Sequence, residues 1–292
     1  MRTAIVVLLG LTACEAAPRD EMAATGSRPD TIDTLAVDDA LLADINPDIE
    51  LRFQIKGTNR PTLKVRDLIA RLEVREVEID DPNHKKEKRF AVIPLLPVLL
   101  DGLGLDESAL ADTKIVMEAR DGYASPVDGK ILTATGAWLA LDDLSVPGWE
   151  TIGEKKADPA PLYVVWTGDR DPHLYPWPWA LSLVRTVSED EEYGAADPGE
   201  SASALAKSGH TLFLKGCIRC HAMNRAGGRL GPELNVPQSI VEYRPVSQIK
   251  DYIRNPLTFR YGNMPANPHL SEADLDALVA YFETMKSRKV SP

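Results

Sequence analysis

Apolar and polar side chains alternate in several short segments of the first two thirds of the chain. Residues 48–55 and 74–79 alternate in this way, which predicts half-buried strands. Residues 114–119 and 162–166 are mainly apolar, as in buried strands, and Asp121-Gly122 predicts a turn after the first of them. Short strands separated by polar loops indicate a domain of mixed α and β structure.

Helical spacing occurs between these strands. Residues 62–72 carry apolar side chains at near-helical intervals, which predicts a helix there. The apolar run 90–100 predicts the end of a strand and then a short helix, entered through proline and stopped at Gly102. The basic run 84–89 predicts a solvated loop.

The last third of the chain has a helical pattern. Residues 204–216 predict a helix with Leu205, Leu212 and Phe213 on its apolar side. A final helix is predicted to begin at Ser271, because Asp274 completes a capping box there. Its apolar stripe should pack across the first helix.

Length and charge divide the chain. A chain of 292 residues favours two domains, and its net charge of −11 argues against a nucleic-acid partner. Residues 36–187 form the first predicted domain and residues 204–288 the second, so the fold class is α+β in two domains. Residues 188–203 are an acidic linker, which self-repulsion should keep extended.

The first 35 residues predict export. Arg2 followed by the apolar run 4–13 is typical of a signal peptide, and the run is too short to span a bilayer, which takes about 20 residues. Small residues before Cys14 resemble a bacterial lipoprotein signal at 1–14, which implies lipidation of Cys14. The alternative is an ordinary cleaved signal with an incidental cysteine. Residues 15–35 predict a flexible tether, which would hold the protein on the periplasmic side of an inner or outer membrane.

The remaining cysteines form one motif, Cys217-Ile218-Arg219-Cys220-His221. This C-x-x-C-H spacing is that of c-type haem attachment, in which two thiols bond one porphyrin and the histidine ligates its iron. A buried cysteine pair, a disulfide or half a zinc site are the alternatives. No cysteine is left to serve as a third zinc ligand.

A loop methionine followed by proline is the second axial ligand expected of class I cytochrome c, which this part of the chain resembles, and Met264 stands in that position, 43 residues after His221. A thioether ligand favours ferrous iron and raises the reduction potential. Met223 is too close to His221 to reach the opposite haem face, and Met285 is in phase with the apolar stripe of the final helix. Bis-histidine ligation is the alternative, with two candidate histidines: His210 and His269.

The order of these features resembles class I cytochrome c over the whole of residues 204–288. A helix, the haem motif, Gly231-Pro232, Met264 and an amphipathic last helix follow one another as in that family. The resemblance implies an all-α domain with one covalent haem c. It also implies that the carbonyl of Pro232 accepts a hydrogen bond from the second imidazole nitrogen of His221.

Residues 90–100, 115–123, 160–166 and 177–179 resemble the sulfite-oxidase-like molybdopterin-binding fold. In that family a strand ends in Asp-Gly-Tyr, as at 121–123 here, and a tryptophan-rich stretch follows later. Its catalytic members hold molybdenum through a cysteine thiolate. No cysteine lies between Cys14 and Cys217, so a degenerate domain without the metal is expected.

These features predict an electron-transfer protein and not an enzyme. From residue 204 onward 12 Lys and Arg stand against 7 Asp and Glu, so the haem domain should be steered toward an acidic redox protein, such as a respiratory or dehydrogenase complex. The first domain would be a docking module. The alternatives are a molybdenum-dependent, sulfite-dehydrogenase-like oxidoreductase with a fused haem acceptor, and a structural subunit of a respiratory membrane complex.

Overall fold

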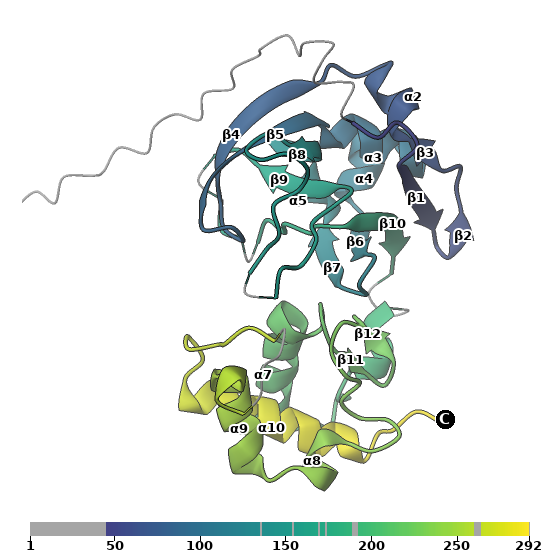
Figure 1. Ribbon diagram of the computed structural model, residues 1–292. Helices are drawn as coiled ribbons and strands as arrows, with labels where there is room; N and C mark the ends of the chain where they lie inside the picture. The colour runs from purple at the N-terminus through teal and green to yellow at the C-terminus, as the bar shows by residue number, and fades with distance from the viewer. Residues whose placement is uncertain are drawn as a thin grey trace, which may run out of the picture.

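The chain forms two lobes, each with its own hydrophobic core, in the computed structural model shown in Figure 1. The first core is built from residues between Ile45 and Val184, and the second from residues between Tyr193 and Met285. The predicted α+β organisation is therefore present. The structure describes residues 45–291, except 135, 154, 169, 173, 189–191 and 260–263. The predicted signal, Cys14, the whole tether at residues 15–35 and the first residues of the predicted domain at 36–187 lie outside the described residues.

Two β-sheets make up the N-terminal domain. The six-stranded sheet has the order β2-β1-β10-β6-β7, with β3 also paired to β1, and β1 and β10 are its parallel pair. The second sheet is antiparallel, in the order β4-β5-β8-β9. The strand bounds are β1 Glu50–Ile55, β2 Thr58–Asn59, β3 Leu63–Lys64, β4 Arg75–Asp81, β5 Lys86–Pro94, β6 Lys114–Ala119, β7 Ala124–Asp128, β8 Ala137–Asp143, β9 Tyr163–Trp166 and β10 Leu181–Val187.

Helix α3 contacts β1 and β10 of the first sheet and β8 of the second, so it joins the two sheets into one core. The remaining described helices of this domain are single turns or little more. The helix bounds are α2 Val65–Ile69, α3 Leu95–Leu103, α4 Glu107–Ala111 and α5 Gly129–Leu132.

The four predicted strands are present, but two helix predictions need correction. The helix predicted at residues 62–72 is only the short α2, preceded by strand β3. Helix α3 runs through Gly102 and ends at Gly104, which adopts a left-handed φ of 66°. A Cβ at position 102 would lie 2.3 Å from the ring of Phe53. Gly102 therefore makes room for a core aromatic side chain and does not stop the helix.

The solvated loop predicted at residues 84–89 was wrong, because most of this run belongs to strand β5. The side chain of Lys88 is fully buried, and its Nζ donates to Asp143 Oδ2 at 2.6 Å and to Glu150 Oε2 at 2.8 Å. Lys86, one pleat away, is half exposed and bonds the other oxygen of Glu150 at 2.7 Å. Alternation along the strand turns Lys88 inward, where Asp143 of the neighbouring strand β8 receives it.

The two lysines lower the pKa of Glu150 to about 2, through hydrogen bonds from Lys86 and then from Lys88. A carboxylate with a depressed pKa stabilises the fold above its ordinary pKa and loses that contribution as the pH falls toward the folded value. We expect Glu150→Gln to reduce the loss of N-terminal domain stability between about pH 4.5 and pH 2. Urea unfolding followed by tryptophan fluorescence measures this, since all five tryptophans lie between residues 138 and 179.

The control for this pH series is Glu78→Gln, at an exposed position of strand β4. This variant removes one carboxyl from the same domain and leaves Glu150 in place, so it measures the effect of losing any carboxylate. Equal acid limbs for Glu150→Gln and the parent would show that the lysines do not depress the pKa of Glu150.

Helices dominate the C-terminal domain. Helix α7 continues into the π-helical turn η2, and α7 crosses the final helix α10 so closely that a Cβ on Gly209 would lie 1.9 Å from the carbonyl oxygen of Ala277. The predicted capping box of Ser271 and Asp274 starts α10. The domain is not strictly all-α, because a small hairpin follows the haem motif. The bounds are α7 Ala204–Leu212, η2 Phe213–Cys217, β11 Ala222–Met223, β12 Ala226–Gly227, α8 Ile240–Tyr243, α9 Val246–Arg254, η3 Pro256–Thr258 and α10 Glu272–Lys286.

The predicted extended linker is packed against the protein from residue 192 onward. Glu192 forms a two-point ion pair with Arg185 of strand β10. Tyr193 is buried in the C-terminal core, and the Tyr281 hydroxyl donates to the Ala196 carbonyl at 2.6 Å. An aromatic anchor and a neutralising arginine thus outweigh the self-repulsion of this acidic segment.

Of the helices that the structure describes, none has the length and hydropathy required to cross a membrane.

Candidate functional site

The haem-attachment motif lies directly after the long helical segment formed by α7 and η2. Cys217 ends η2, and its carbonyl accepts hydrogen bonds from the amides of Cys220 at 3.1 Å and His221 at 2.9 Å. One tight turn therefore holds both thiols and the imidazole. This is the arrangement that attachment of a single porphyrin through two thioethers needs.

Both cysteines are free thiols in the structure. Burial raises the pKa of Cys217 to about 12, and burial followed by the charge of Asp121 raises that of Cys220 to about 11. At neutral pH these thiols are protonated, whereas nucleophilic cysteines have a lowered pKa. The pair is therefore unsuited to act as an activated thiolate.

The imidazole of His221 is oriented by the loop that follows it. Its Nδ1 lies 2.8 Å from the carbonyl oxygen of Pro232, which fixes the ring and leaves Nε2 available as a ligand. Burial lowers the pKa of His221, so the ring is neutral, as a metal ligand must be. A Cβ at Gly231 would lie 2.5 Å from the Cε1 atom of His221, so glycine is needed for the loop to pass this close.

Hydrogen bonds to polar side chains hold the loop at residues 231–236, the braced loop, in place. Four backbone amides donate to the carboxylate of Glu233, those of Asn224, Arg225, Asn235 and Val236. The side-chain Nδ2 of Asn235 donates to Asn224 Oδ1 at 2.8 Å and to the backbone carbonyl of Met285 at 2.7 Å. The carbonyl that orients His221 is therefore tied to helix α10.

The second-ligand candidates occupy different environments. Met264 is half-buried. It directly follows residues 260–263, which are not among the residues that the structure describes. Met223 and Met285 are completely buried in the C-terminal core. His210 packs its ring against Tyr281, with centroids 5.3 Å apart, while His269 is exposed. Of the methionines in this domain, Met264 is the one that the core does not use.

These residues fit a covalently bound haem. Two free thiols and a neutral, oriented imidazole lie on one turn, and the loop passes beside the ring at Gly231, which has no side chain. Sequence reasoning missed the contact between this site and the N-terminal domain. The turn at residues 121–123 reaches the haem motif, although its Asp-Gly pair predicted only a reversal of the chain.

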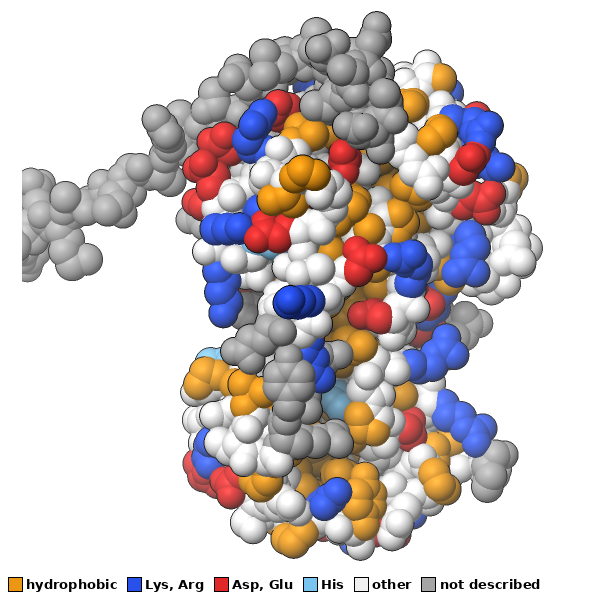
Figure 2. Space-filling view, viewed as in Figure 1, with side chains coloured by type: hydrophobic (Ala, Val, Ile, Leu, Met, Phe, Trp, Pro, Cys, Tyr) orange, Lys and Arg blue, Asp and Glu red, His pale blue; other side chains and the backbone are white. Residues whose placement is uncertain are grey.

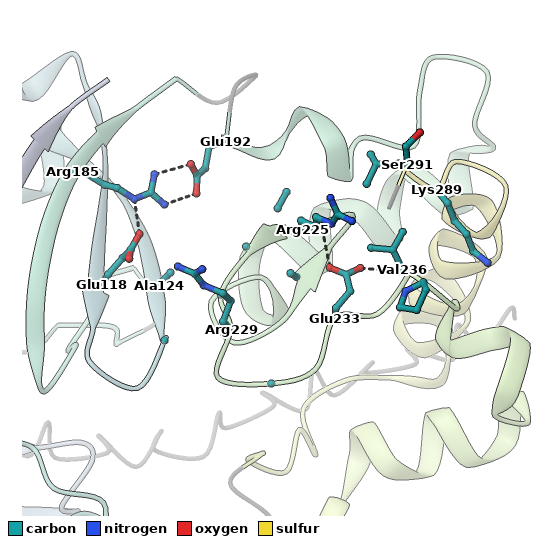
Figure 3. A pocket seen from close by; sticks show the side chains of 18 residues that line it. Glu118, Ala124, Arg185, Glu192, Arg225, Arg229, Glu233, Val236, Lys289 and Ser291 are labelled. Atoms are coloured by element: carbon teal, nitrogen blue, oxygen red, sulfur yellow. Dashed lines mark hydrogen bonds and ion pairs between the residues drawn. The ribbon is translucent and has the colours of Figure 1, made fainter. Parts of the chain in front are cut away.

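A cleft of about 1130 Å³ opens between the two domains beside this contact (Figure 3). On its N-terminal side Arg185 bonds both Glu118, at 2.5 Å, and Glu192. Although burial opposes its charge, these two carboxylates raise the pKa of Arg185 above its ordinary value. On the other side lies the braced loop with Glu233. The cleft therefore lies between a strand side chain, Arg185, held by two ion pairs and a loop held by hydrogen bonds to Glu233.

Comparison with known proteins agrees with this site. The family described as cytochrome c oxidase, cbb3-type, subunit III matches residues 204–282. Cytochrome c oxidase subunit 2 of Alkalihalophilus pseudofirmus is 34% identical over 112 residues, which is 34% of this chain and 32% of that protein. The chain thus covers about a third of this relative.

The match of residues 204–282 supports a haem-binding domain of the electron-transfer class. More particularly, the C-terminal domain is a cytochrome c domain, and such domains carry covalently bound haem c. The N-terminal domain has mixed sheets and helices, and the match does not extend to it.

Proposed function

We propose that this protein is an exported, monohaem c-type cytochrome that passes single electrons between redox partners. Cys217 and Cys220 attach the haem, and His221 and Met264 ligate its iron. The observation that carries the proposal is the 2.8 Å contact between Nδ1 of His221 and Pro232, since it presents Nε2 of a neutral ring beside both thiols. When bound, the haem supplies a centre that cycles between ferric and ferrous iron.

The side chains of the protein decide what such a centre does. His221 and Met264 would both hold the iron, which would leave no position on it for a small substrate. The carbonyl of Pro232, in a loop held by hydrogen bonds to Glu233, orients the imidazole and would limit its movement when the iron changes oxidation state. Such a centre would suit electron transfer and not oxygen chemistry.

The redox partner is proposed to be a respiratory or dehydrogenase complex. Support comes from the oxidase subunits that the chain resembles. Hydrophobic side chains gather on the visible face of the C-terminal domain in Figure 2, and Leu257 and Phe259, just before the Met264 loop, are about half exposed. An apolar surface beside the ligand loop suits brief contact with another protein.

The N-terminal domain is proposed to be a docking module, and Cys14 a lipid anchor on the periplasmic side of the membrane. No cysteine lies between Cys14 and Cys217 to hold molybdenum, so the enzyme alternative has no anchoring ligand of the usual kind. A structural subunit of a respiratory complex is the second candidate, favoured by the same oxidase relatives. A complex that kept its full activity after loss of this haem would support it.

The metal and cofactor content of the purified protein tests this proposal. Protein made in a host that matures both haem c and molybdopterin should contain one iron per chain and no molybdenum. The haem should remain on the polypeptide after denaturation, because two thioethers hold it. Elemental analysis and the haem absorption of the denatured chain measure this.

The matched control is Cys217→Ser with Cys220→Ser, which should abolish the covalent haem. Stoichiometric molybdenum in the parent protein would overturn the proposal and indicate an enzyme. An absence of covalent haem would leave a cysteine pair without its proposed cofactor and refute the cytochrome.

A further inference from the structure

Two backbone hydrogen bonds join the N-terminal domain to the haem site. The turn between β6 and β7 accepts at the Gly122 carbonyl from the Arg229 amide, at 2.8 Å, and donates from the Ala124 amide to the Arg219 carbonyl, at 2.9 Å. Figure 1 shows this end of the β6–β7 hairpin directed at the C-terminal domain. Arg219 lies inside the haem motif, and Arg229 immediately precedes the loop that orients His221.

The two haem-site segments that receive the turn are themselves bonded to each other. The Gly228 amide donates to Ile218, and the Gly231 amide to Cys220, both at 2.7 Å. The turn at residues 121–123 therefore adds a third layer of chain to the pair that holds the histidine. Gly122 of the turn bonds the segment of Arg229, and Ala124, directly after the turn, bonds the segment of Arg219.

The fit between the turn and the loop is tight. Gly122 has a φ of +93°, and a Cβ there would lie 3.2 Å from the carbonyl carbon of Arg229 and 3.4 Å from the amide of Leu230. A side chain at this position would press on the haem loop, and the left-handed backbone would oppose it as well. Glycine thus permits the two domains to meet backbone to backbone.

The turn is also anchored in its own domain. The Tyr123 amide donates to Asp121 Oδ1 at 3.0 Å, which closes the turn. The Tyr123 ring stacks on Trp179, with centroids 6.5 Å apart and planes 9° apart, and its phenol interacts with the side chain of Arg219. A movement of the N-terminal domain would therefore be transmitted to the haem motif.

We propose that the Asp121-Gly122-Tyr123 turn is a positioning element for His221, by which the N-terminal domain sets the reduction potential of the haem. This rests on the proposed ligation of iron by His221. A hydrogen bond from Nδ1 to a carbonyl makes imidazole a stronger donor and favours ferric iron. The turn holds the loop that supplies this carbonyl, so releasing the turn weakens the bond and raises the potential. On this face the partner of the first domain is the haem domain of the same chain.

The test compares Gly122→Ala with Gly57→Ala in the full-length, haem-loaded protein. Both glycines lie in hairpin turns of the same domain with positive φ, +93° and +74°, but a Cβ at Gly57 would meet nothing within 4 Å. The strain from positive φ is therefore matched, and only Gly122→Ala presses on the haem loop. Hydrogen exchange of the Arg229 and Ala124 amides and the midpoint potential of the haem are measured.

For Gly122→Ala we expect at least tenfold faster exchange of both amides and a higher midpoint potential. The shift in the ferric–ferrous equilibrium should be up to about tenfold, which is 59 mV for one electron. Gly57→Ala should change neither. Unchanged exchange in Gly122→Ala would refute the contact, and faster exchange with an unchanged potential would refute the positioning role. A haem count of one per chain in both variants shows separately that haem attachment itself has not failed.

Discussion

Replacement of Met264 by histidine should lower the haem potential by on the order of 0.2 V, within the roughly 0.8 V range that axial ligands span. A thioether is a weak donor that favours ferrous iron, whereas imidazole favours ferric iron. The weak far-red absorption band of ferric methionine ligation should disappear at the same time. Potentiometric titration and the ferric spectrum measure the two effects.

The matched control is Met285→Leu, at a methionine that is completely buried in the C-terminal core. A volume-conserving change there should cost less than about 1.5 kcal/mol of stability and leave the far-red band in place. A Met264→His protein with the parent spectrum would show that another side chain ligates the iron. A parent protein without the far-red band would indicate histidine ligation, and a changed haem spectrum in His269→Ala or His210→Ala would then identify the residue.

Replacement of Lys88 by methionine should destabilise the N-terminal domain by about 3–5 kcal/mol. Lys88 and Asp143 have no exposed side-chain surface, and their atoms lie 2.6 Å apart. Removing the lysine leaves a buried carboxylate without its cation, and a lone buried charge is unfavourable. Urea unfolding followed by tryptophan fluorescence reports on this domain alone, because all five tryptophans lie within it.

The control is Lys86→Met, which removes a cation from the same acid, Glu150, at a half-exposed position. That change should cost no more than about 1 kcal/mol, since exposed ion pairs contribute little. The double variant Lys88→Met with Asp143→Asn should recover part of the lost stability, because it removes the unpaired buried charge and keeps one oxygen for the backbone amides of Ser145 and Glu150 that bond Asp143. Equal losses for Lys88→Met and Lys86→Met would show that burial does not strengthen the dependence on Lys88.

The hydrogen bond between Gly122 and Arg229 shows that the N-terminal domain is in contact with the haem domain and is not only a separate docking module. A module joined by an extended linker would leave the haem domain free to move. Here the segment from residue 192 packs onto the C-terminal core through Tyr193, and the β6–β7 turn bonds the haem loop. The first domain is then part of the environment of the haem as well as a surface for partners.

Local patterns determined much of this protein. The spacing from Cys217 to His221 specifies which side chains share one helical turn, and that is a short-range property of the chain. Ser271 and Asp274 likewise define the start of α10 within four residues. Strands β1, β4, β6 and β9 followed from alternation or from apolar runs, because each buries at least one of its faces.

Only the tertiary structure decided the features that depend on residues far apart in sequence. Whether Lys88 is solvated depends on Asp143, 55 positions away on a neighbouring strand. Whether Gly102 ends a helix depends on the ring of Phe53, and whether Gly122 is only a turn residue depends on Arg229. The sequence by itself determined the candidate site for haem attachment, since the two thiols and the imidazole that it needs lie within five residues. The tertiary structure decided which charges are buried and how the first domain meets the haem loop, since these contacts form only when distant segments pack together.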